Sequence, residues 1–392
     1  MTIYLDHAAS APLRPEAAAA WLEASREVGN ASSIHGSGQV ARRSLEEARE
    51  RLASLVEADP AEIVFTSGGT ESINLALKGM WTSRLPGTTG IVLPDGEHHA
   101  TLDSVEWLAA SQGAQILPVP LDVDGRIGHE GFCDALSGAA LATALVANNE
   151  VGTLNDAAGL ARAASDAGVP LHLDAVAAFG HVPVSFRQWR ADAAPGAGLV
   201  ALSVAGHKIG APVGVGALAV ARSARIAPLL HGGRQQRGLR AGTQDVAGAV
   251  AFAAAAEIAL AERETEARRL AALRDGLVSA VTTTIPDARL LGDPTRRIPG
   301  NAHLHFPGAL GETLLFLLDQ AGISVSTGSA CQAGVAEPSH VVLAMGHDAT
   351  AAREVLRITL GHTTTPADVA ALAAALPEAV ARARGAGSGR RS

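Results

Sequence analysis

Short apolar runs alternate with amphipathic segments along the first 248 residues. The apolar runs that are candidates for buried strands are residues 63–66, 90–93, 115–119, 141–146, 170–174, 198–203 and 215–220. Several segments between them, such as residues 101–112 and 156–167, have the apolar spacing of helices. Strands that alternate with helices are typical of a mostly parallel sheet with helices on both faces. The pattern therefore predicts an α/β domain over residues 15–248.

The pattern changes after residue 248. Residues 249–281 are rich in alanine, glutamate and arginine and predict a long helix, and shorter helices and strands follow as far as residue 384. This pattern predicts a second, smaller α+β domain, which consists of residues 1–14 and 249–384. Residues 385–392 are expected to form a disordered tail.

Composition narrows the function classes. A chain of 392 residues is long for one simple core, which agrees with two domains. The net charge of −8 argues against a general nucleic-acid binder. Two cysteines, Cys133 and Cys331, without a C-x-x-C pair exclude a disulfide framework and favour a reducing compartment. No apolar stretch is long enough to cross a membrane and no signal peptide is recognisable, so we expect a cytoplasmic protein.

Lysine is scarce in this chain. Only two of the 31 basic residues are lysines, Lys78 and Lys208. Lys208 closes the segment Gly206–His207–Lys208 just after the apolar run 198–203, where an open α/β sheet places its ligand chemistry. An amine, unlike a guanidinium, loses its proton and forms Schiff bases. Lys208 is therefore a candidate for covalent chemistry, and the alternative is a surface lysine retained by chance.

Other predicted strand ends also carry polar residues. Residues 67–71, Ser-Gly-Gly-Thr-Glu, precede a helix and form either a phosphate cradle or an ordinary capped turn. Asn148–Asn149–Glu150 follows one strand, and Asp174 ends another, where a buried carboxylate needs a cationic partner or hydrogen-bond donors. A lysine for a Schiff base, an aspartate for a pyridinium nitrogen and an anion cradle together indicate pyridoxal 5'-phosphate.

Segments around these residues resemble the cysteine desulfurases, fold-type I pyridoxal-phosphate enzymes of the class V aminotransferase group. The resemblance covers nearly the whole chain apart from the tail. The matching segments are residues 4–9, 65–72, 97–99, 148–152, 173–175, 206–208, 237–243 and 328–331. The last, Gly-Ser-Ala-Cys, is the most specific. The stretch from Cys331 to Glu337–Pro338–Ser339 is similar to the subgroup with an extended loop, which serves iron–sulfur cluster assembly and tRNA thiolation.

The resemblance implies a set of cofactor-binding residues. They are Gly69, Thr70, His98, Asn149, Asp174, Ala177, Ala205, Gly206, His207, Lys208 and Thr243. Lys208 would hold the cofactor as a Schiff base, and Gly69, Thr70 and His207 would bind its phosphate. Thr243 would reach that phosphate from the other subunit of a homodimer.

The resemblance also implies roles in the reaction. His98 would stack on the cofactor ring and move protons, and Asn149 would contact the ring hydroxyl and the substrate. Arg357 would bind the substrate carboxylate with two donors. L-Cysteine would become L-alanine while the thiolate of Cys331, the candidate nucleophile, becomes a persulfide.

The expected partners follow from this reaction. The sulfur would pass to an acceptor protein, an iron–sulfur scaffold or a tRNA thiolase, with contact to an iron–sulfur cluster through Cys331 during transfer. No metal, membrane or direct nucleic-acid partner is expected. His172 is interpreted as a hydrogen-bonded structural histidine, and Cys133 as a buried, inert thiol.

Three positions depart from the family pattern. Ala177 stands where a glutamine is usual, Ala205 where a serine is usual, and His362 where an arginine is common. The first two changes remove side-chain hydrogen bonds to the cofactor. A selenocysteine lyase or aminotransferase of the same fold remains an alternative, and so does a non-catalytic docking protein of a sulfur relay.

Overall fold

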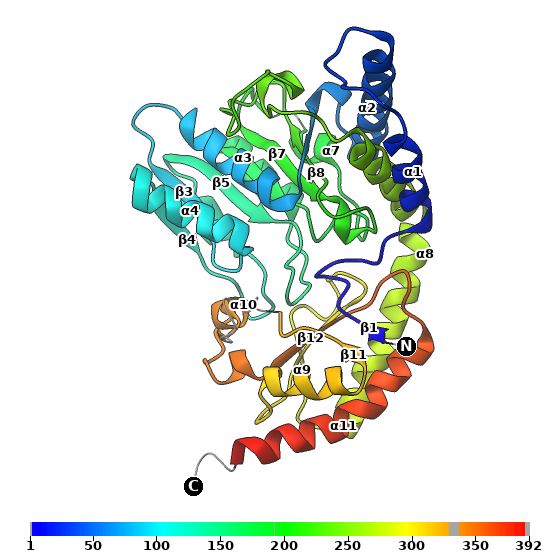
Figure 1. Ribbon diagram of the computed structural model, residues 1–392. Coiled ribbons are helices and arrows are strands. Elements are labelled where there is room, and N and C mark those ends of the chain that lie inside the picture. The colour runs from blue at the N-terminus through cyan, green and yellow to red at the C-terminus, as the bar shows by residue number, and fades with distance from the viewer. Residues whose placement is uncertain (1, 192, 329–336, 389–392) are drawn as a thin grey trace.

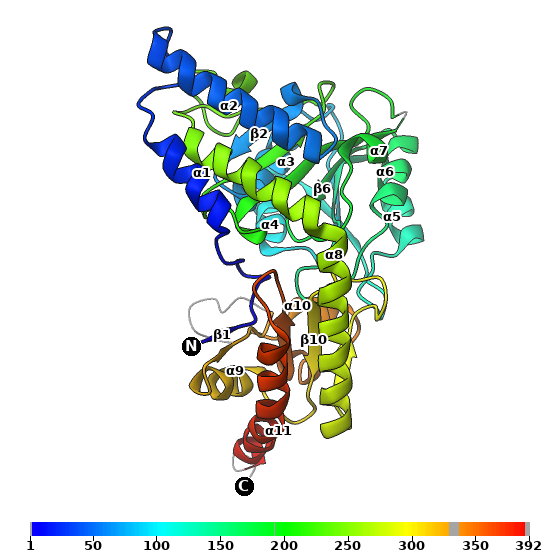
Figure 2. The same cartoon turned by 90° about the vertical axis from the view of Figure 1, so that its right-hand side faces the viewer.

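The computed structural model describes residues 2–191, 193–328 and 337–388. In this part of the chain a large domain lies above a smaller one, and the long helix α8 (Val246–Thr284) runs along the side of both (Figures 1 and 2). The predicted combination of a helix-covered sheet domain with a smaller α+β domain is confirmed.

The large domain is built on a seven-stranded sheet in the order β2-β8-β7-β6-β5-β3-β4. Its strands are β2 (Ile63–Thr66), β3 (Gly90–Pro94), β4 (Gln115–Val119), β5 (Ala139–Leu145), β6 (Pro170–Asp174), β7 (Gly198–Ala205) and β8 (Gly216–Val220). The five strands from β4 to β7 pair in parallel, and β8 is antiparallel to both of its neighbours. The inner strands β5, β7 and β8 are buried along their whole length because both faces of the sheet are covered.

Helices cover both faces of this sheet. α3 and α4 lie on one face and α5, α6 and α7 on the other, while α1 and α2 pack against α8 (Figure 2). Their bounds are α1 (Pro15–Ser25), α2 (Gly36–Leu55), α3 (Gly69–Thr82), α4 (His99–Gln112), α5 (His129–Ala135), α6 (Ala157–Asp166) and α7 (Phe186–Arg190). Short 3-10 turns occur at η1 (Pro60–Glu62), η2 (Gly206–Lys208), η3 (Gln236–Gly238) and η4 (Ala351–Arg353).

The small domain holds a three-stranded antiparallel sheet in the order β12-β10-β9 and a parallel pair, β1 with β11. The strands are β1 (Ile3–Tyr4), β9 (Arg289–Leu291), β10 (Asn301–His305), β11 (Ile323–Ser324) and β12 (Val355–Thr359). Its helices are α9 (Gly311–Gln320), α10 (His340–Ala344) and α11 (Pro366–Ser388).

The end of α11 differs from the prediction. A disordered tail was expected from residue 385, and this is wrong for residues 385–388, which continue the helix. Arg384 anchors this end, because its guanidinium donates to the carbonyl oxygen of Pro307 over 2.9 Å and pairs with Asp287 over 2.7 Å. Residues 389–392 lie outside the described part of the chain.

Helix α8 belongs to both hydrophobic cores. Its buried residues as far as Ala259 pack into the large-domain core, and those from Leu270 onward pack into the small-domain core with Leu5. We therefore propose that the boundary between the domains lies inside α8, between Ala259 and Leu270, rather than at residue 248.

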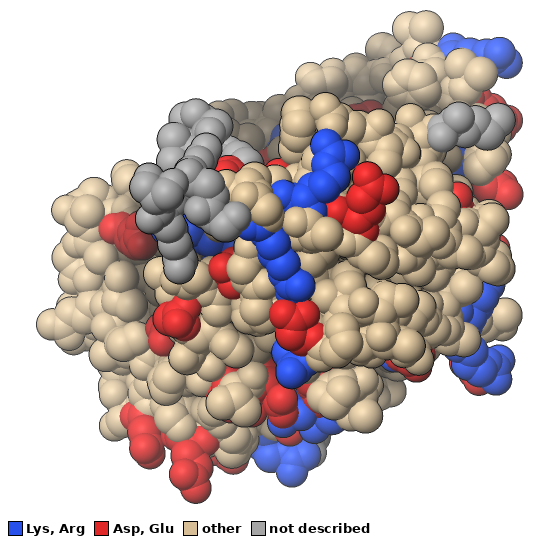
Figure 3. Space-filling view, turned by 90° about the horizontal axis from the view of Figure 1, so that it is seen from below, with Lys and Arg blue, Asp and Glu red and all other residues tan. Residues whose placement is uncertain are grey.

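Charges of both signs occur on one face of the molecule. The face seen from below shows basic and acidic side chains interspersed with broad uncharged areas (Figure 3). In the described ranges 2–191, 193–328 and 337–388, no helix combines the length and apolar character needed to cross a membrane.

Candidate active site

The carboxyl ends of β5, β6 and β7 lie at one edge of the sheet, because these strands are parallel neighbours. Asn149 follows β5, Asp174 ends β6, and Lys208 closes the η2 turn after β7. A small cavity at this edge is lined by Lys208, Asn149 and Ala177 of the large domain and by Thr359 of the small domain. The structure thus brings together residues that are far apart in the sequence.

Lys208 points its amine into this region. Its Nζ donates to the carbonyl oxygens of Ala8 over 2.5 Å and Ala9 over 3.1 Å. Burial and the nearby Arg357 guanidinium lower the pKa of Lys208 to about 8. A lysine with such a pKa has a much larger neutral fraction near neutral pH than an ordinary lysine, and a nucleophilic amine must be neutral. The other lysine, Lys78, instead places its Nζ 4.6 Å from the ring centre of Trp107.

Asp174 is a carboxylate with few partners. Its side chain is buried and accepts a hydrogen bond from the backbone N–H of Val176 over 2.9 Å. Burial raises the pKa of Asp174 to about 6, and the hydrogen bond and the charge of Lys208 oppose that rise. A protonated pyridine nitrogen is the kind of cationic partner that such a carboxylate lacks here.

Two further features test whether pyridoxal phosphate fits. The side-chain oxygen of Asn149 is buried and has no hydrogen-bond partner among the described residues. The turn before α3 has Gly68 at a φ of 150°, and a Cβ on Gly69 would lie 2.8 Å from a methyl group of Val176. The first N–H groups of a helix have no partner within it and attract an anion. An amine, a buried carboxylate, an unpaired amide oxygen and a glycine-lined helix start fit this cofactor.

His98 caps the start of α4. Its Nδ1 accepts a hydrogen bond from the backbone N–H of Ala100 over 3.0 Å, so the proton of the neutral ring is on Nε2. Burial and the charge of Lys208 lower the pKa of His98 to about 4. The ring is therefore neutral at physiological pH, which suits stacking on an aromatic cofactor.

The remaining phosphate candidates differ in exposure. His207 is half-buried, and burial followed by the charge of Lys208 lowers its pKa to about 4. Thr70 and Thr243 expose their side chains in this single chain. The inter-subunit contact predicted for Thr243 stays a prediction.

Arg357 reaches the site from β12. Its guanidinium donates to Asp6 Oδ1 over 3.0 Å and to the carbonyl oxygen of Asn149 over 2.9 Å, while its buried Nε has no hydrogen-bond partner among the residues that the structure describes. These two partners hold the guanidinium near the cavity, and a guanidinium is the group that binds a carboxylate through two donors. The sequence pattern did not indicate Asp6 as the partner of Arg357, although Asp6 lies in the matching segment 4–9.

The two alanines that depart from the family pattern place apolar side chains at this sheet edge. Ala177 lines the cavity, and Ala205 is fully buried at the end of β7. A Cβ on the next residue, Gly206, would lie only 2.9 Å from that of Ala211, so this position has no room for a side chain. The interpretation of His172 as a hydrogen-bonded structural histidine is confirmed, because its ring bonds the hydroxyls of Thr143 and Ser203 over 2.9 and 2.8 Å.

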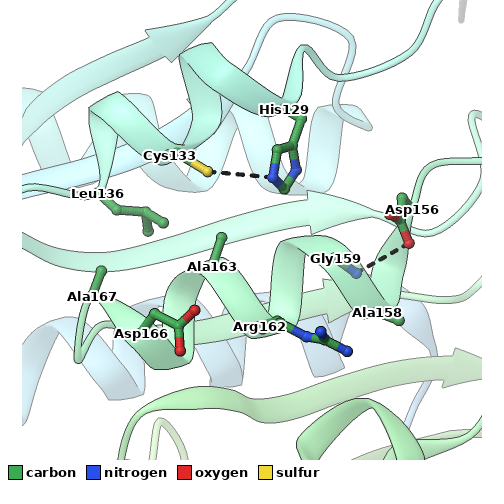
Figure 4. Close-up of a pocket in the computed structure, with 10 residues that line it drawn as sticks. All are labelled: His129, Cys133, Leu136, Asp156, Ala158, Gly159, Arg162, Ala163, Asp166 and Ala167. Carbon is green, nitrogen blue, oxygen red and sulfur yellow. Dashed lines mark hydrogen bonds between the residues drawn. The ribbon is translucent and has the colours of Figure 1, made fainter.

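The predictions for the two cysteines have different outcomes. Cys331 lies outside the described residues. Cys133 was expected to be buried, and this is wrong, because its side chain is exposed with Sγ 3.6 Å from His129 Nε2. On α5 the inward positions belong to Phe132 and, one turn on, Leu136, so Cys133 faces outward. It lines a groove between α5 and α6 that shares no residue with the cavity at Lys208 (Figure 4).

Comparison with known proteins gives the family. Residues 3–372 match the model of the aminotransferase class-V family. The chain is 49% identical over 388 residues to an IscS-like cysteine desulfurase of Mycobacterium tuberculosis, with 97% of each chain covered. It is 37% identical over 385 residues to the cysteine desulfurase NifS of Azotobacter vinelandii, covering 97% of this chain and 93% of that protein. A solved NifS-like protein superimposes with a TM-score of 0.90 at 31% identity, covering 97% of this chain and 100% of the other.

The match extends across both domains and includes the segments that form the site. The chain therefore belongs to the class-V aminotransferase family, in the branch of the cysteine desulfurases that it resembles.

Proposed function

We propose that this protein is a pyridoxal-phosphate-dependent L-cysteine desulfurase, which converts L-cysteine into L-alanine and carries the sulfur as a persulfide on Cys331. One arrangement supports the proposal most strongly. The low-pKa amine of Lys208 lies at the same sheet edge as the buried carboxylate of Asp174, and Arg357 presents its donors beside the cavity. This set combines covalent cofactor chemistry with recognition of an amino acid carboxylate.

The residues present could hold the cofactor in one orientation. Lys208 would bind it covalently, Asp174 would face its ring nitrogen, and Asn149 would meet its ring hydroxyl. The first turn of α3 and His207 would bind its phosphate. When bound, pyridoxal phosphate supplies an electron sink for bonds at the substrate Cα.

The protein groups then divide the work of the reaction. Arg357 holds the substrate carboxylate with two donors. The amine of Lys208 takes the Cα proton, and His98 keeps a proton available at Nε2. The thiolate of Cys331 attacks the substrate sulfur, so that a sulfur–sulfur bond forms as the carbon–sulfur bond breaks. Proton return to the substrate carbons yields alanine.

We propose that the enzyme acts as a homodimer. Residues 31–32 and 233–237 line one groove on the large domain, and Ile34 beside it is 91% exposed. Leu230 also presents apolar surface to solvent. A second copy placed on this surface would cover these residues and bring Thr243 toward the partner's cofactor. Size-exclusion chromatography with light scattering tests the dimer, and a monomer at micromolar concentration would contradict it.

We further propose a cytoplasmic enzyme that hands its sulfur to an acceptor protein of iron–sulfur cluster assembly or tRNA thiolation. A reducing compartment keeps a nucleophilic thiol such as that of Cys331 in its reduced form, and the two-cysteine composition favours such a compartment.

A single experiment tests the activity. Purified protein loaded with pyridoxal phosphate receives L-cysteine, and alanine and protein persulfide are both quantified. Wild type and Cys133→Ser are expected to form alanine and a persulfide on Cys331, whereas Cys331→Ser forms almost no persulfide. A modified Cys133 with an unmodified Cys331 would contradict the proposed nucleophile.

The same samples separate the alternatives. Faster release of selenium from selenocysteine than of sulfur from cysteine would indicate a selenocysteine lyase. Transfer of the amino group to a keto acid would indicate an aminotransferase. A non-catalytic docking protein would be indicated if wild type lacks the yellow absorbance of bound cofactor. The absorbance spectrum of Lys208→Ala would then be the same as that of wild type.

A further inference from the structure

Glu150 is a buried carboxylate that the proposed mechanism leaves without a role. Its side chain is only 1% exposed, yet it lies in the loop between β5 and α6, next to Asn149 of the cavity. A carboxylate at such depth carries a desolvation cost, so its presence calls for specific partners. Those partners are on the small domain.

The first partner is Ser339. The hydroxyl of Ser339 donates to Glu150 Oε2 over 2.5 Å, and the same hydroxyl accepts from the backbone N–H of Val342 at the start of α10. His340 follows, with its Nδ1 3.8 Å from the other oxygen of Glu150 and its Nε2 donating to the carbonyl oxygen of Glu97 over 2.9 Å. The stretch that follows the Cys331 segment is thus attached to the large domain.

The second contact lies before the Cys331 segment. Gly328 has a φ of 90°, and a Cβ there would come within 3.1 Å of Glu150 Oε2 and 3.0 Å of His303 Cε1. Gly328 therefore packs directly against the Glu150 carboxylate. One side chain contacts the residue before the segment 329–336 and the residues after it.

Hydrogen bonds fix the conformation of the loop that carries Glu150. Asn148 accepts hydrogen bonds from the N–H groups of Glu150 and Val151 over 2.9 and 3.0 Å. The carbonyl oxygen of Asn149 accepts from Arg357, and the carbonyl oxygen of Glu150 accepts from Asn301. The positions of the cavity amide, of Arg357 and of Glu150 are therefore coupled through one short loop.

We propose that Glu150 is a positioning residue for sulfur transfer, which fixes both described ends of the Cys331 segment relative to Asn149 and Arg357. This inference rests on the proposed desulfurase activity. Glu150 touches neither substrate nor cofactor in this role, and it acts through Ser339, His340 and Gly328. Misplacing a reacting group by about 1 Å costs on the order of 100-fold in rate, so a positioning contact has a measurable effect.

The test uses Glu150→Gln, which keeps the volume of the side chain and removes its charge. The rate of persulfide formation on Cys331 is expected to fall by roughly 10- to 100-fold. The cofactor absorbance, its initial change on addition of L-cysteine, and the KM for cysteine are expected to stay at wild-type values. Glu354→Gln is the matched control, because it makes the same change at a carboxylate that lies 3.4 Å from His305.

Ser339→Ala gives an independent test, because it removes the hydroxyl from the other side. Ser339→Ala is also expected to slow persulfide formation. In the double variant Glu150→Gln with Ser339→Ala, the loss of rate is expected to be smaller than the product of the two single losses. Wild-type persulfide rates in both single variants would overturn the inference, and so would a parallel loss of cofactor binding and thermal stability. If wild type itself forms no alanine, the proposed function fails instead.

Discussion

Burial, more than ion pairing, sets the protonation of the side chains around the cavity. It is the largest cause of the lowered pKa values of Lys208 and His98 and of the raised pKa of Asp174. In each case burial disfavours the charged form. The site therefore contains an amine that loses its proton more easily than an ordinary lysine, a neutral imidazole, and a carboxylate that holds its proton more strongly than an ordinary aspartate.

Asp6 modifies this balance at Lys208. Its negative charge raises the pKa of Lys208, while Arg357 lowers it. Asp6→Asn is therefore expected to lower the pKa of Lys208 further below about 8. Cofactor-free protein is mixed with pyridoxal phosphate at a series of pH values, and the pH midpoint of the covalent reaction is measured. The midpoint is expected to shift downward, while Asp287→Asn, whose partner Arg384 is on α11, leaves it unchanged. An upward shift would contradict this assignment of charges.

Chemistry and position in the chain were enough to predict Lys208 and Asp174. The scarcity of lysine indicated Lys208 and the polar strand end indicated Asp174, whereas the role of Arg357 was implied by the family resemblance. Asp6 gave no such signal as a partner, because the residue it contacts is 351 positions away in the chain. Cys133 was predicted wrongly because the helical phase of α5 decides which side chains face inward, and a seven-residue helix gives too little periodicity to determine it.

At the scale of elements, the start of α3 is braced by an ion pair. Glu71 in its first turn accepts a hydrogen bond from the backbone N–H of Ser67 over 2.7 Å and pairs with Arg240 over 2.9 Å. Arg240 lies in the loop that continues to Thr243. The pair neutralises a carboxylate near the proposed phosphate site and joins the two segments that would bind phosphate.

Arg240→Gln is expected to weaken the binding of pyridoxal phosphate, because Glu71 then carries an uncompensated negative charge near the phosphate. A hydrogen bond to a charged group contributes roughly 1.5–3 kcal/mol, so the loss is expected to be about tenfold or more. Equilibrium binding is measured in a Lys208→Ala background, where no covalent link masks the change. Arg268→Gln is the control, because Arg268 pairs with Glu264 on the exposed side of α8. Adding Glu71→Gln is expected to recover part of the affinity, and no recovery would contradict the electrostatic explanation.

The elements themselves were predicted well where the pattern was strong. Seven apolar runs became the seven strands of the large sheet. The antiparallel direction of β8 was not predictable, because an apolar run has the same pattern in either direction. The shared role of α8 was also missed, since its buried residues serve two cores and no break in the helix marks the change.

At the scale of the whole molecule, the site depends on two domains that close on the same sheet edge. The N-terminal segment crosses between them, because Leu5 packs in the small-domain core while the backbone N–H of Ala11 bonds the carbonyl oxygen of His207 over 2.8 Å. Ala8 and Ala9, which hold the amine of Lys208, lie on this crossing. Separation of the domains would therefore disturb Lys208 and Arg357, the residue proposed to bind the substrate carboxylate, at the same time.

This architecture buries many histidines, and it makes the cofactor-free protein sensitive to acid. Burial is the largest cause of lowered pKa values, about 3 to about 4, in His7, His98, His172, His207 and His303. A group whose pKa is lower in the folded state binds its proton mainly on unfolding. Below a pH of about 6.5 the unfolded chain therefore takes up protons that the folded chain excludes, and the free energy of unfolding falls as pH decreases.

Three carboxyl groups, those of Asp95, Glu97 and Asp174, oppose this trend, because burial raises the pKa of each. Burial raises the pKa of Glu97 to about 8 and that of Asp174 to about 6, so the folded state holds protons there that the unfolded state has lost. Because the histidines outnumber these carboxyls, the free energy of unfolding is expected to fall by at least ~1.4 kcal/mol per pH unit between about pH 6 and pH 5. Urea unfolding of the cofactor-free protein at several pH values measures this slope. His172→Gln removes one of the contributing histidines. It is expected to reduce this slope by the contribution of up to about one proton taken up on unfolding. A free energy of unfolding that stays constant or rises as the pH falls through this window would show that these histidines are protonated in the folded protein.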